Sequence, residues 1–340
     1  MCPSTALRRP PFVFHCDMLL LQGVFRSGTT ALFRVLRRDE RLRCFYEPLH
    51  PNVLHHAREA HDARPDHPKS SLYAEYAPLL DQLKPKLDSA LPDWPHWLDA
   101  DDEAPTLATY LRRLADVDAA PLLQFNRAFW MGGWLARTFP EASFVHLVRD
   151  PRSVVWSQLT TASGERVRMD WPLVGRLLPF SSGALRRVFS DHAYFGAYQL
   201  DEYFEAGLRL LDDGPGNAVL DSALRRLEAV REAPPYVKAL ALWGAQVEIC
   251  HHHAQSAFGP RFLWLRYEDL CDVPCEHLWS IYDLQNRPLP DSVRKCARRT
   301  IDPSRRRRWA DVPTAEQHFR EGIEQAQIAG LMRDLGYDPL

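Results

Sequence analysis

Short apolar runs alternate with amphipathic segments along much of the chain, a pattern typical of an α/β fold. The apolar runs predict buried strands at residues 18–21, 121–125, 144–148 and 262–266. Apolar residues at helical spacing predict helices at residues 31–36, 106–114, 126–139, 185–211, 220–232, 236–258 and 315–335. Strands connected by helices pair in parallel, so the pattern predicts a central parallel sheet flanked by helices.

The organisation of the chain predicts one α/β domain over residues 1–340 with a helical insertion. From roughly residue 164 to residue 235 the alternation of strands and helices stops, and only helical spacing continues. Residues 51–105 are rich in His, Pro and Asp and predict short helical pieces with exposed connections. The length of 340 residues allows one large domain or two smaller ones.

A glycine-containing loop, Gly23–Thr30, follows the first predicted strand and precedes the first predicted helix. Strand, glycine loop and helix form a phosphate cradle, because the N–H groups at the helix start face an anion. The loop departs from the nucleotide-triphosphate pattern G-x-x-x-x-G-K-[ST], since Thr29 replaces the lysine and the cation is Arg26. This indicates a ligand with a shorter anionic end that needs no metal. The alternative is a simple turn between a strand and a helix.

A second motif begins at the end of the predicted strand 144–148. Arg149 ends the strand, Asp150 is a good N-cap, Pro151 suits the first helical position, and Ser157 falls in the early helical turns. In a parallel sheet this motif and the glycine loop open on the same edge, where ligands bind. Arg149 then fits a phosphate; the alternative is that it pairs with a surface carboxylate.

Together the two motifs resemble the sulfotransferases that use 3′-phosphoadenosine 5′-phosphosulfate (PAPS) as donor. The glycine loop resembles their 5′-phosphosulfate loop, in the Arg-Ser-Gly-Thr-Thr form of carbohydrate and tyrosylprotein sulfotransferases, and the second motif resembles their 3′-phosphate motif. Residues 262–270 resemble a late strand with its R-Y-E-D-L turn, and residues 304–313 a loop that closes over the donor. The resemblance implies a P-loop-NTPase-like sulfotransferase fold and sulfuryl transfer from PAPS, which leaves adenosine 3′,5′-bisphosphate (PAP).

The resemblance also implies roles for particular residues, with no metal required. Arg26 stabilises the leaving phosphate. The donor contacts that it implies come from the glycine loop, the second motif and the closing loop: Arg26, Ser27, Gly28, Thr29, Thr30, Arg149, Ser157, Ser304, Arg308 and Trp309.

Glu47 is the candidate general base of this reaction. It lies twenty-one positions after Arg26, the offset of the catalytic glutamate in tyrosylprotein sulfotransferases. The alternative reading is a surface glutamate before a proline turn. His50 is the nearest rival, because imidazole suits proton abstraction near neutral pH. Asn126 and Arg127 either line the acceptor cleft or cap the following helix.

The acceptor is expected to be a small molecule or glycan, with its hydroxyl on a carbohydrate, lipid or secondary metabolite. An aromatic stripe is more typical of core packing, but it is where the predicted insertion would touch an acceptor: Tyr194, Phe195, Tyr198, Tyr203 and Phe204. Two other functions remain open. A P-loop nucleotide kinase would use Mg·ATP but needs the missing loop lysine, and a non-catalytic module would bind adenosine bisphosphate without turnover.

The composition limits which binding partners and which cellular location are expected for the protein. A formal net charge of −2 gives no general attraction to nucleic acid or acidic membranes. Seven cysteines without a CxxC pair indicate reduced thiols in a cytoplasmic protein. The apolar stretch near the start is interrupted at residues 15–17, so it predicts neither a signal peptide nor a membrane span. The consecutive histidines 251–253 point in different directions on a helix and predict no metal site.

Overall fold

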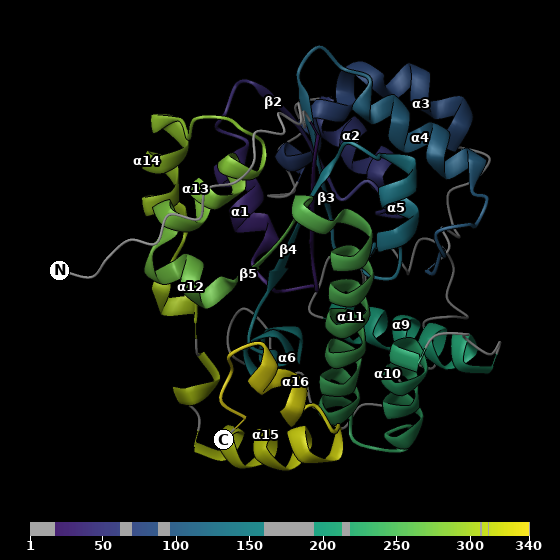
Figure 1. Ribbon diagram of the computed structural model, residues 1–340, viewed down its shortest axis with the longest axis vertical. Helices are drawn as coiled ribbons and strands as arrows, with labels where there is room; N and C mark the ends of the chain where they lie inside the picture. Colours follow the sequence, from purple (N-terminus) through teal and green to yellow (C-terminus); the bar gives the residue numbers. More distant parts are fainter. Residues whose placement is uncertain are drawn as a thin grey trace.

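A five-stranded sheet forms the centre of the computed structural model, which describes residues 18–61, 70–87, 96–159, 194–212, 218–306, 308–311 and 313–339 (Figure 1). Its strands are β1 (Leu19–Gly23), β2 (Leu42–Tyr46), β3 (Ala120–Phe125), β4 (Ser143–Val148) and β5 (Phe262–Arg266). All neighbouring strands pair in parallel, in the order β2-β3-β1-β4-β5. The predicted parallel α/β architecture is confirmed.

Helices cover both faces of the sheet, which is why every residue of β1, β3 and β4 is buried (Figure 1). One face is covered by α1 (Thr29–Leu36), α13 (Pro274–Leu284) and α14 (Asp291–Thr300). The other face is covered by α5 (Gly132–Thr138) and the long helix α11 (Pro235–Phe258). Helices α9 (Tyr194–Asp212) and α10 (Ala218–Ala229) pack against α11.

The remaining helical elements surround this three-layer core. The α-helices are α2 (Val53–His61), α3 (Leu80–Leu87), α4 (Pro105–Ala115), α6 (Pro151–Leu159), α12 (Tyr267–Asp272), α15 (Pro313–Gln325) and α16 (Ala329–Asp334). The 3₁₀ turns are η1 (Ser70–Leu79), η3 (Gly259–Arg261), η4 (Pro303–Arg305) and η5 (Arg308–Asp311). Among the described helices, none combines the length and apolar character needed to cross a bilayer.

The structure departs from the predicted elements in three places. Strand β2 was not predicted, because it is a short edge strand whose apolar run is interrupted by the exposed Arg43. The helix predicted over 126–139 begins only at Gly132, and the residues before it turn across the end of β3. The helix predicted over 315–335 is two helices, broken where Gln327 adopts a φ of 54°.

The predicted helical insertion is described only in part. Residues 160–193 lie outside the described residues, and so does the start of the helix predicted over 185–211. The described part, α9 and α10, has the predicted helical character. The assignment of residues 1–340 to one domain stays a prediction.

The carboxyl ends of the five parallel strands open on one edge of the sheet, and β1 lies at the centre of the strand order. Ligand sites of parallel sheets form at this edge, where the strand order changes direction. The residues that follow the strands are the glycine loop after β1, Glu47 after β2, Asn126 after β3, Arg149 after β4 and Tyr267 after β5. The fold therefore gathers the predicted site residues from segments far apart in the sequence.

The first prediction concerns His146, which lies on β4 against α11 with no hydrogen-bond partner at either ring nitrogen. Burial, together with the nearby His251, lowers the pKa of His146 from 6.5 to about 3. The folded state thus disfavours the imidazolium that the unfolded chain accepts near pH 6.5. We expect the free energy of unfolding to fall by about 1.4 kcal/mol per pH unit from this group as the pH drops below 6.5.

Urea denaturation between pH 8 and pH 5 tests this, because His146→Leu removes the titrating group. The variant should lose stability less steeply than the wild type on acidification. His252→Leu, at an exposed position of α11, is the matched control and should follow the wild-type slope. Equal slopes for all three proteins would contradict the prediction.

Candidate functional site

The glycine loop connects β1 to α1 through a tightly constrained backbone. Gly28 has a φ of 100° and Arg26 a φ of 73°, a region in which non-glycine residues are rare. A Cβ on Gly28 would lie 2.3 Å from Cδ2 of Tyr267, so only glycine fits beneath that ring. The N–H of Ala31 donates to the Gly28 carbonyl at 3.0 Å. The N–H groups that precede it at a helix start lack partners within the helix, which makes the start of α1 suited to an anion.

The side chains of the loop divide into two groups. The hydroxyl of Ser27 is buried and has no hydrogen-bond partner, so this residue fits a phosphate oxygen. The hydroxyl of Thr29 donates to Oδ1 of Asn126 at 2.8 Å, and the hydroxyl of Thr30 shares a 2.7 Å hydrogen bond with that of Tyr46. Any phosphate contact from these two threonines is therefore expected from the backbone N–H groups rather than from the hydroxyls.

The second motif lies directly against the loop. Arg149 follows β4 and donates from Nη1 to the carbonyl of Arg26 at 2.9 Å. Its guanidinium lies 4.7 Å from the ring centroid of Tyr267, and burial lowers the pKa of Arg149. Nε of Arg26 donates to the hydroxyl of Ser157 on α6 at 2.8 Å. The structure thus brings together Arg26, Arg149 and Ser157, as the two motifs predict.

The described part of the predicted closing loop (residues 304–313), here called the C-terminal loop, packs onto the start of α6. Asp150 caps this helix, because its Oδ1 accepts the N–H of Arg152 at 2.9 Å, as predicted for an N-cap. The side chain of Arg152 pairs with Asp150 at 2.7 Å and lies 4.6 Å from the ring centroid of the buried Trp309. The hydroxyl of Ser153 donates to the carbonyl of Arg306. Trp309 therefore anchors the loop to the protein.

For the other two residues predicted to contact the donor from this loop, Ser304 and Arg308, the structure gives less information. Ser304 is exposed, and its hydroxyl donates to Asp302 at 2.6 Å. The backbone of Arg308 lies in η5, but its side chain lies outside the described structure. Their roles at the donor remain predictions.

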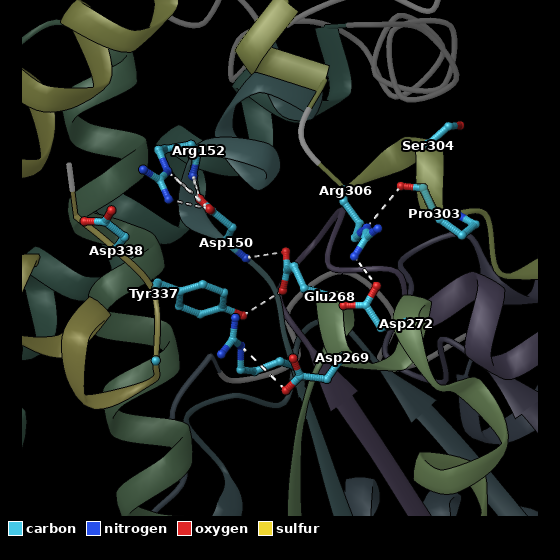
Figure 2. Close-up of a pocket in the computed structure, with 12 residues that line it drawn as sticks. Asp150, Arg152, Glu268, Asp269, Asp272, Pro303, Ser304, Arg306, Tyr337 and Asp338 are labelled. Carbon is cyan, nitrogen blue, oxygen red and sulfur yellow. Dashed lines mark hydrogen bonds and ion pairs between the residues drawn. The ribbon is translucent and has the colours of Figure 1, made fainter.

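A cavity of about 480 Å³ opens beside this loop (Figure 2). Its charged lining consists of three arginines and five carboxylates, and each arginine pairs with a carboxylate: Arg152 with Asp150, Arg266 with Asp269, and Arg306 with Asp272. Burial, and then the charge of Asp150, raises the pKa of Glu268, which accepts hydrogen bonds from the Asp150 N–H at 3.1 Å and the Tyr337 hydroxyl at 3.0 Å. Of the predicted donor residues, Ser304 lines this cavity, whereas Arg26, Arg149 and Ser157 do not.

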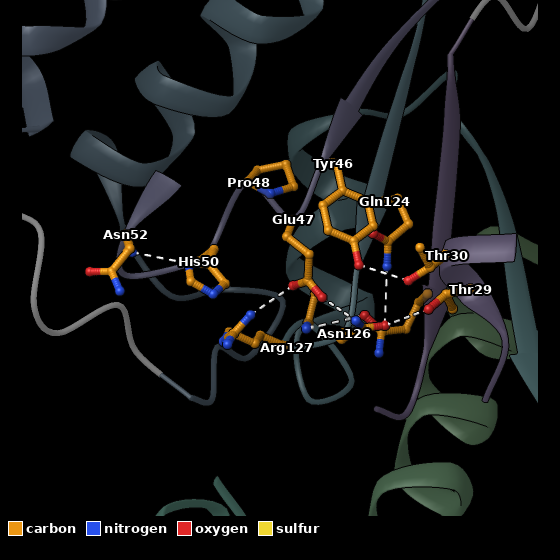
Figure 3. Close-up of polar contacts among 12 residues, drawn as sticks. Thr29, Thr30, Tyr46, Glu47, Pro48, His50, Asn52, Gln124, Asn126 and Arg127 are labelled. Carbon is orange, nitrogen blue, oxygen red and sulfur yellow. Dashed lines mark hydrogen bonds and ion pairs between the residues drawn. The ribbon is translucent and has the colours of Figure 1, made fainter. Parts of the chain in front are cut away.

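Glu47 is buried at the end of β2, with 3% of its surface exposed (Figure 3). Its Oε1 accepts a hydrogen bond from Nδ2 of Asn126, and its Oε2 pairs with Nη1 of Arg127 at 2.7 Å. The backbone adopts a φ of 47°, and the Glu47 N–H donates to the carbonyl of Gln124 at 2.9 Å. The alternative reading of a surface glutamate before a turn is wrong, because this carboxylate is buried and ion-paired.

His50 lies on the same segment but is less suited to act as the base. Its Nδ1 accepts a hydrogen bond from the N–H of Asn52 at 3.0 Å, and its ring packs against His56 and Tyr73. A neutral imidazole that accepts at Nδ1 carries its proton on Nε2 and has no nitrogen left to accept another. The geometry therefore favours Glu47.

Asn126 and Arg127 contribute to the site and do not cap a helix, since α5 begins at Gly132. Burial lowers and the Glu47 carboxylate raises the pKa of Arg127, with a net increase. The guanidinium of Arg127 lies 4.8 Å from the ring centroid of Phe25 in the glycine loop. The roles of Gln124 and Tyr46 were not predicted, although a glutamine inside an otherwise apolar strand is a signal for such a contact.

Tyr203 of α9 brings the described end of the aromatic stripe to this site. Its ring centroid lies 6.3 Å from that of Phe25, 5.1 Å from that of Phe129 and 4.9 Å from that of His96. The side chains of Tyr194, Phe195 and Tyr198 lie outside the described structure. The stripe therefore both packs in the core and reaches the edge of the site.

In the described parts of the chain, no group of three or more His, Cys, Asp or Glu side chains could hold a metal ion. The described cysteines are free thiols, three of them buried: Cys44, Cys250, Cys271, Cys275 and Cys296. The absence of a metal requirement stays a prediction.

Comparison with known proteins identifies the segment that carries both motifs. Residues 19–172 match the model of the sulfotransferase family, Sulfotransfer_3. This segment is similar to the sulfotransferase family. The match contains Arg26, Glu47, Arg149 and Ser157, and it ends before β5 and the C-terminal loop. No curated protein matches the chain.

Three solved sulfotransferase structures are similar to this chain. The sulfotransferase domain from the curacin biosynthetic pathway has a TM-score of 0.48 and 16% identity, over 94% of this chain and 98% of that chain. The sulfotransferase domain from the Synechococcus PCC 7002 olefin synthase has a TM-score of 0.42 and 16% identity, over 92% and 94%. Sulfotransferase STF1 from Mycobacterium tuberculosis H37Rv has a TM-score of 0.39 and 15% identity, over 83% and 70%. The assignment rests on the family match and the motifs.

The second prediction concerns the buried ion pair of the site, in which Arg127 and Glu47 have side chains 8% and 3% exposed. Arg127→Met should lower the free energy of unfolding by about 3–5 kcal/mol, because it leaves a buried carboxylate unpaired. Adding Glu47→Gln should recover part of the loss. Urea denaturation at pH 7 measures both effects.

The matched control is Arg225→Met on α10. Arg225 pairs with Asp221 at 2.9 Å, but its side chain is 70% exposed. Removal of an exposed pair should cost less than about 1 kcal/mol. If Arg127→Met and Arg225→Met lowered the free energy of unfolding by similar amounts, burial would not make the Glu47–Arg127 pair more costly to break, and the prediction would be wrong.

Proposed function

We propose that this protein transfers a sulfuryl group from PAPS to a hydroxyl of a carbohydrate, lipid or secondary metabolite. The observation that carries the proposal is the contact between the two phosphate motifs. Arg149 bonds to the carbonyl of Arg26, and the side chain of Arg26 reaches Ser157. Two cations from segments far apart in sequence thus meet at the ligand-binding edge of the sheet, inside the family match. A ligand with two separated phosphate groups fits this arrangement.

This geometry supports a particular set of donor contacts. The 5′-phosphosulfate would lie over the glycine loop, against the N–H groups of residues 28–30 and the partner-free hydroxyl of Ser27. The 3′-phosphate would take the guanidinium of Arg149 and the hydroxyl of Ser157, because an arginine fork fits a phosphate well. The C-terminal loop, through Ser304, Arg308 and Trp309, would close over the donor.

The reaction is an in-line displacement at sulfur. The acceptor oxygen forms a bond to sulfur while the bond from sulfur to the bridging phosphate oxygen breaks. The acceptor proton passes to Glu47, and the bridging oxygen leaves with the electron pair as part of PAP. By analogy with phosphoryl transfer the transition state is loose, so charge accumulates on the leaving oxygen. Arg26 would stabilise that charge after exchanging its contact with Ser157 for the donor.

Glu47 suits the role of base because of its fixed position. One carboxylate oxygen takes the Asn126 amide and the other takes Arg127. A carboxylate has about four acceptor sites in all, so the acceptor hydroxyl could also donate to it. Such a preset geometry favours proton abstraction in the transition state.

The two alternative functions fit less well. A kinase of the P-loop type has a lysine at the position of Thr29, which binds the phosphates. The hydroxyl of its next residue, at the position of Thr30, holds Mg²⁺. Here Thr29 bonds to Asn126, and the hydroxyl of Thr30 is engaged with Tyr46. A module that only binds adenosine bisphosphate would need no buried carboxylate beside the loop.

We further propose that the enzyme is cytoplasmic, needs no metal, does not bind nucleic acid and acts on a small-molecule or glycan acceptor. The free thiols of the described cysteines and the formal net charge of −2 support this view.

The third prediction tests the donor site by thermal unfolding with PAP, 5′-AMP or Mg·ATP. PAP at a hundredfold excess over its Kd should stabilise the folded protein by about 2.7 kcal/mol. Arg149→Ala should abolish this stabilisation, whereas Arg225→Ala on the distant helix α10 should not. Stabilisation by Mg·ATP without any from PAP would refute the sulfotransferase proposal and favour the kinase.

The fourth prediction concerns Glu47. Glu47→Gln should lower the rate of PAP release from PAPS by about 10²–10⁴-fold, the usual contribution of a general base. Stabilisation by PAP should persist in the variant, because the carboxylate bonds to Asn126 and Arg127, and neither of these is a proposed donor contact. Unchanged PAP release in Glu47→Gln would exclude Glu47 as the base, and an inactive wild type that binds PAP would favour the non-catalytic module.

A further inference from the structure

One amide, that of Asn126, connects the donor loop to the proposed base (Figure 3). Its Oδ1 accepts the Thr29 hydroxyl at 2.8 Å and Nε2 of Gln124 at 3.1 Å. Its Nδ2 donates to Oε1 of Glu47, whose Oε2 pairs with Arg127 at 2.7 Å. Three segments therefore meet at one side chain: the first residue of α1, the end of β2 and the end of β3.

The hydrogen bonds fix which way the amide faces. The Glu47 carboxylate can only accept hydrogen bonds, so the NH₂ group of Asn126 must face it. The Asn126 oxygen then faces Thr29 and Gln124, which both donate to it. If the Thr29 hydroxyl were removed, one of the two donors that hold the Asn126 oxygen in place would be lost.

Burial makes the arrangement sensitive to change. Thr29, Gln124, Asn126 and Glu47 are 2%, 0%, 5% and 3% exposed. Water cannot readily replace a lost hydrogen bond among these groups, and each bond is stronger at low local dielectric. Glu47 also holds a φ of 47°, a strained conformation that persists only when its surroundings impose it.

We propose that Asn126 is a positioning residue that fixes the Glu47 carboxylate relative to the donor loop, and that Thr29 acts through it. The catalytic part of this inference rests on the proposed function. The hydroxyl of Thr29 would then contribute to the reaction rate by positioning Asn126. The other proposed contacts of the glycine loop would bind the donor. Loss of that hydroxyl should reduce kcat and spare the affinity for PAP.

The first test requires no activity. Thr29→Val and Glu47→Gln remove groups that do not contact each other, so their effects on Tm should add unless Asn126 links them. We expect a deviation from additivity of roughly 2 °C in the wild-type background and none in an Asn126→Ala background. Thr30→Val is the matched control, because its hydroxyl bonds to Tyr46, and any coupling that it shows should survive Asn126→Ala. If Thr29→Val does not fold, Thr29→Ala replaces it, and Thr29→Ser, which keeps the hydroxyl, should retain the wild-type coupling.

The second test measures PAP release from PAPS, with PAP binding followed by thermal shift. Thr29→Val and Asn126→Ala should each lower kcat on the order of tenfold, with the affinity for PAP changed less than about threefold. The double variant should be no slower than Asn126→Ala alone, and Thr29→Ser should restore the rate. Asn126→Asp should move the acid limb of the kcat profile to higher pH, because two adjacent carboxylates share a proton.

Each outcome decides the matter. Additive effects of Thr29→Val and Glu47→Gln on Tm would overturn the link. Coupling on Tm with normal kcat in Thr29→Val would overturn the positioning role. A wild type that binds PAP and shows the coupling but never releases PAP from PAPS would refute the proposed function, and with it the catalytic role of Asn126, while the structural link would stand.

Discussion

The ion pair between Glu47 and Arg127 is the constraint on which the site depends. A carboxylate and a guanidinium are tolerated in a buried position only when they are paired and hydrogen-bonded. The pair forms because β2 and β3 are neighbours in a register that sets Tyr46 opposite Gln124. One residue beyond that register, the Glu47 N–H reaches the Gln124 carbonyl, and the side chain faces Asn126 and Arg127. A slip of one residue would separate the charges, so the site and the edge of the sheet support each other.

The strained backbone of the site likewise depends on contacts from neighbouring strand ends. Arg26 and Glu47 both adopt positive φ values, which cost on the order of 1 kcal/mol or more for non-glycine residues. Each is held from outside its own segment. Arg149 holds the carbonyl of Arg26, and Arg127 holds the Glu47 carboxylate. The ends of β3 and β4 therefore stabilise the conformations of the segments after β1 and β2, so these four strand ends support one another.

The sequence allowed prediction of those features that local patterns encode. The glycine loop and the strand-end arginine follow from spacing and capping, so the parallel sheet and the meeting of Arg26, Arg149 and Ser157 were predicted. Strand β2 was not, because Arg43 interrupts a run of five residues whose strand character comes from pairing with β3. The Thr29–Asn126–Glu47 chain depends on the same cross-strand register, which no local pattern contains. Trp309 was predicted at the donor, but its contact with Arg152 depends on how the C-terminal loop crosses α6.

The arginines of the two phosphate motifs already have partners within the protein, and this has a consequence for selectivity. Arg149 donates to a backbone carbonyl, and Arg26 donates to a serine hydroxyl. A ligand must therefore offer better acceptors than these neutral groups, and hydrogen bonds to a phosphate are roughly twice as strong as neutral ones. A ligand with one phosphate could replace only one of the two contacts. Under the proposed function, a ligand with phosphates at both ends of its ribose could replace both, so we expect it to bind more tightly than a mononucleotide.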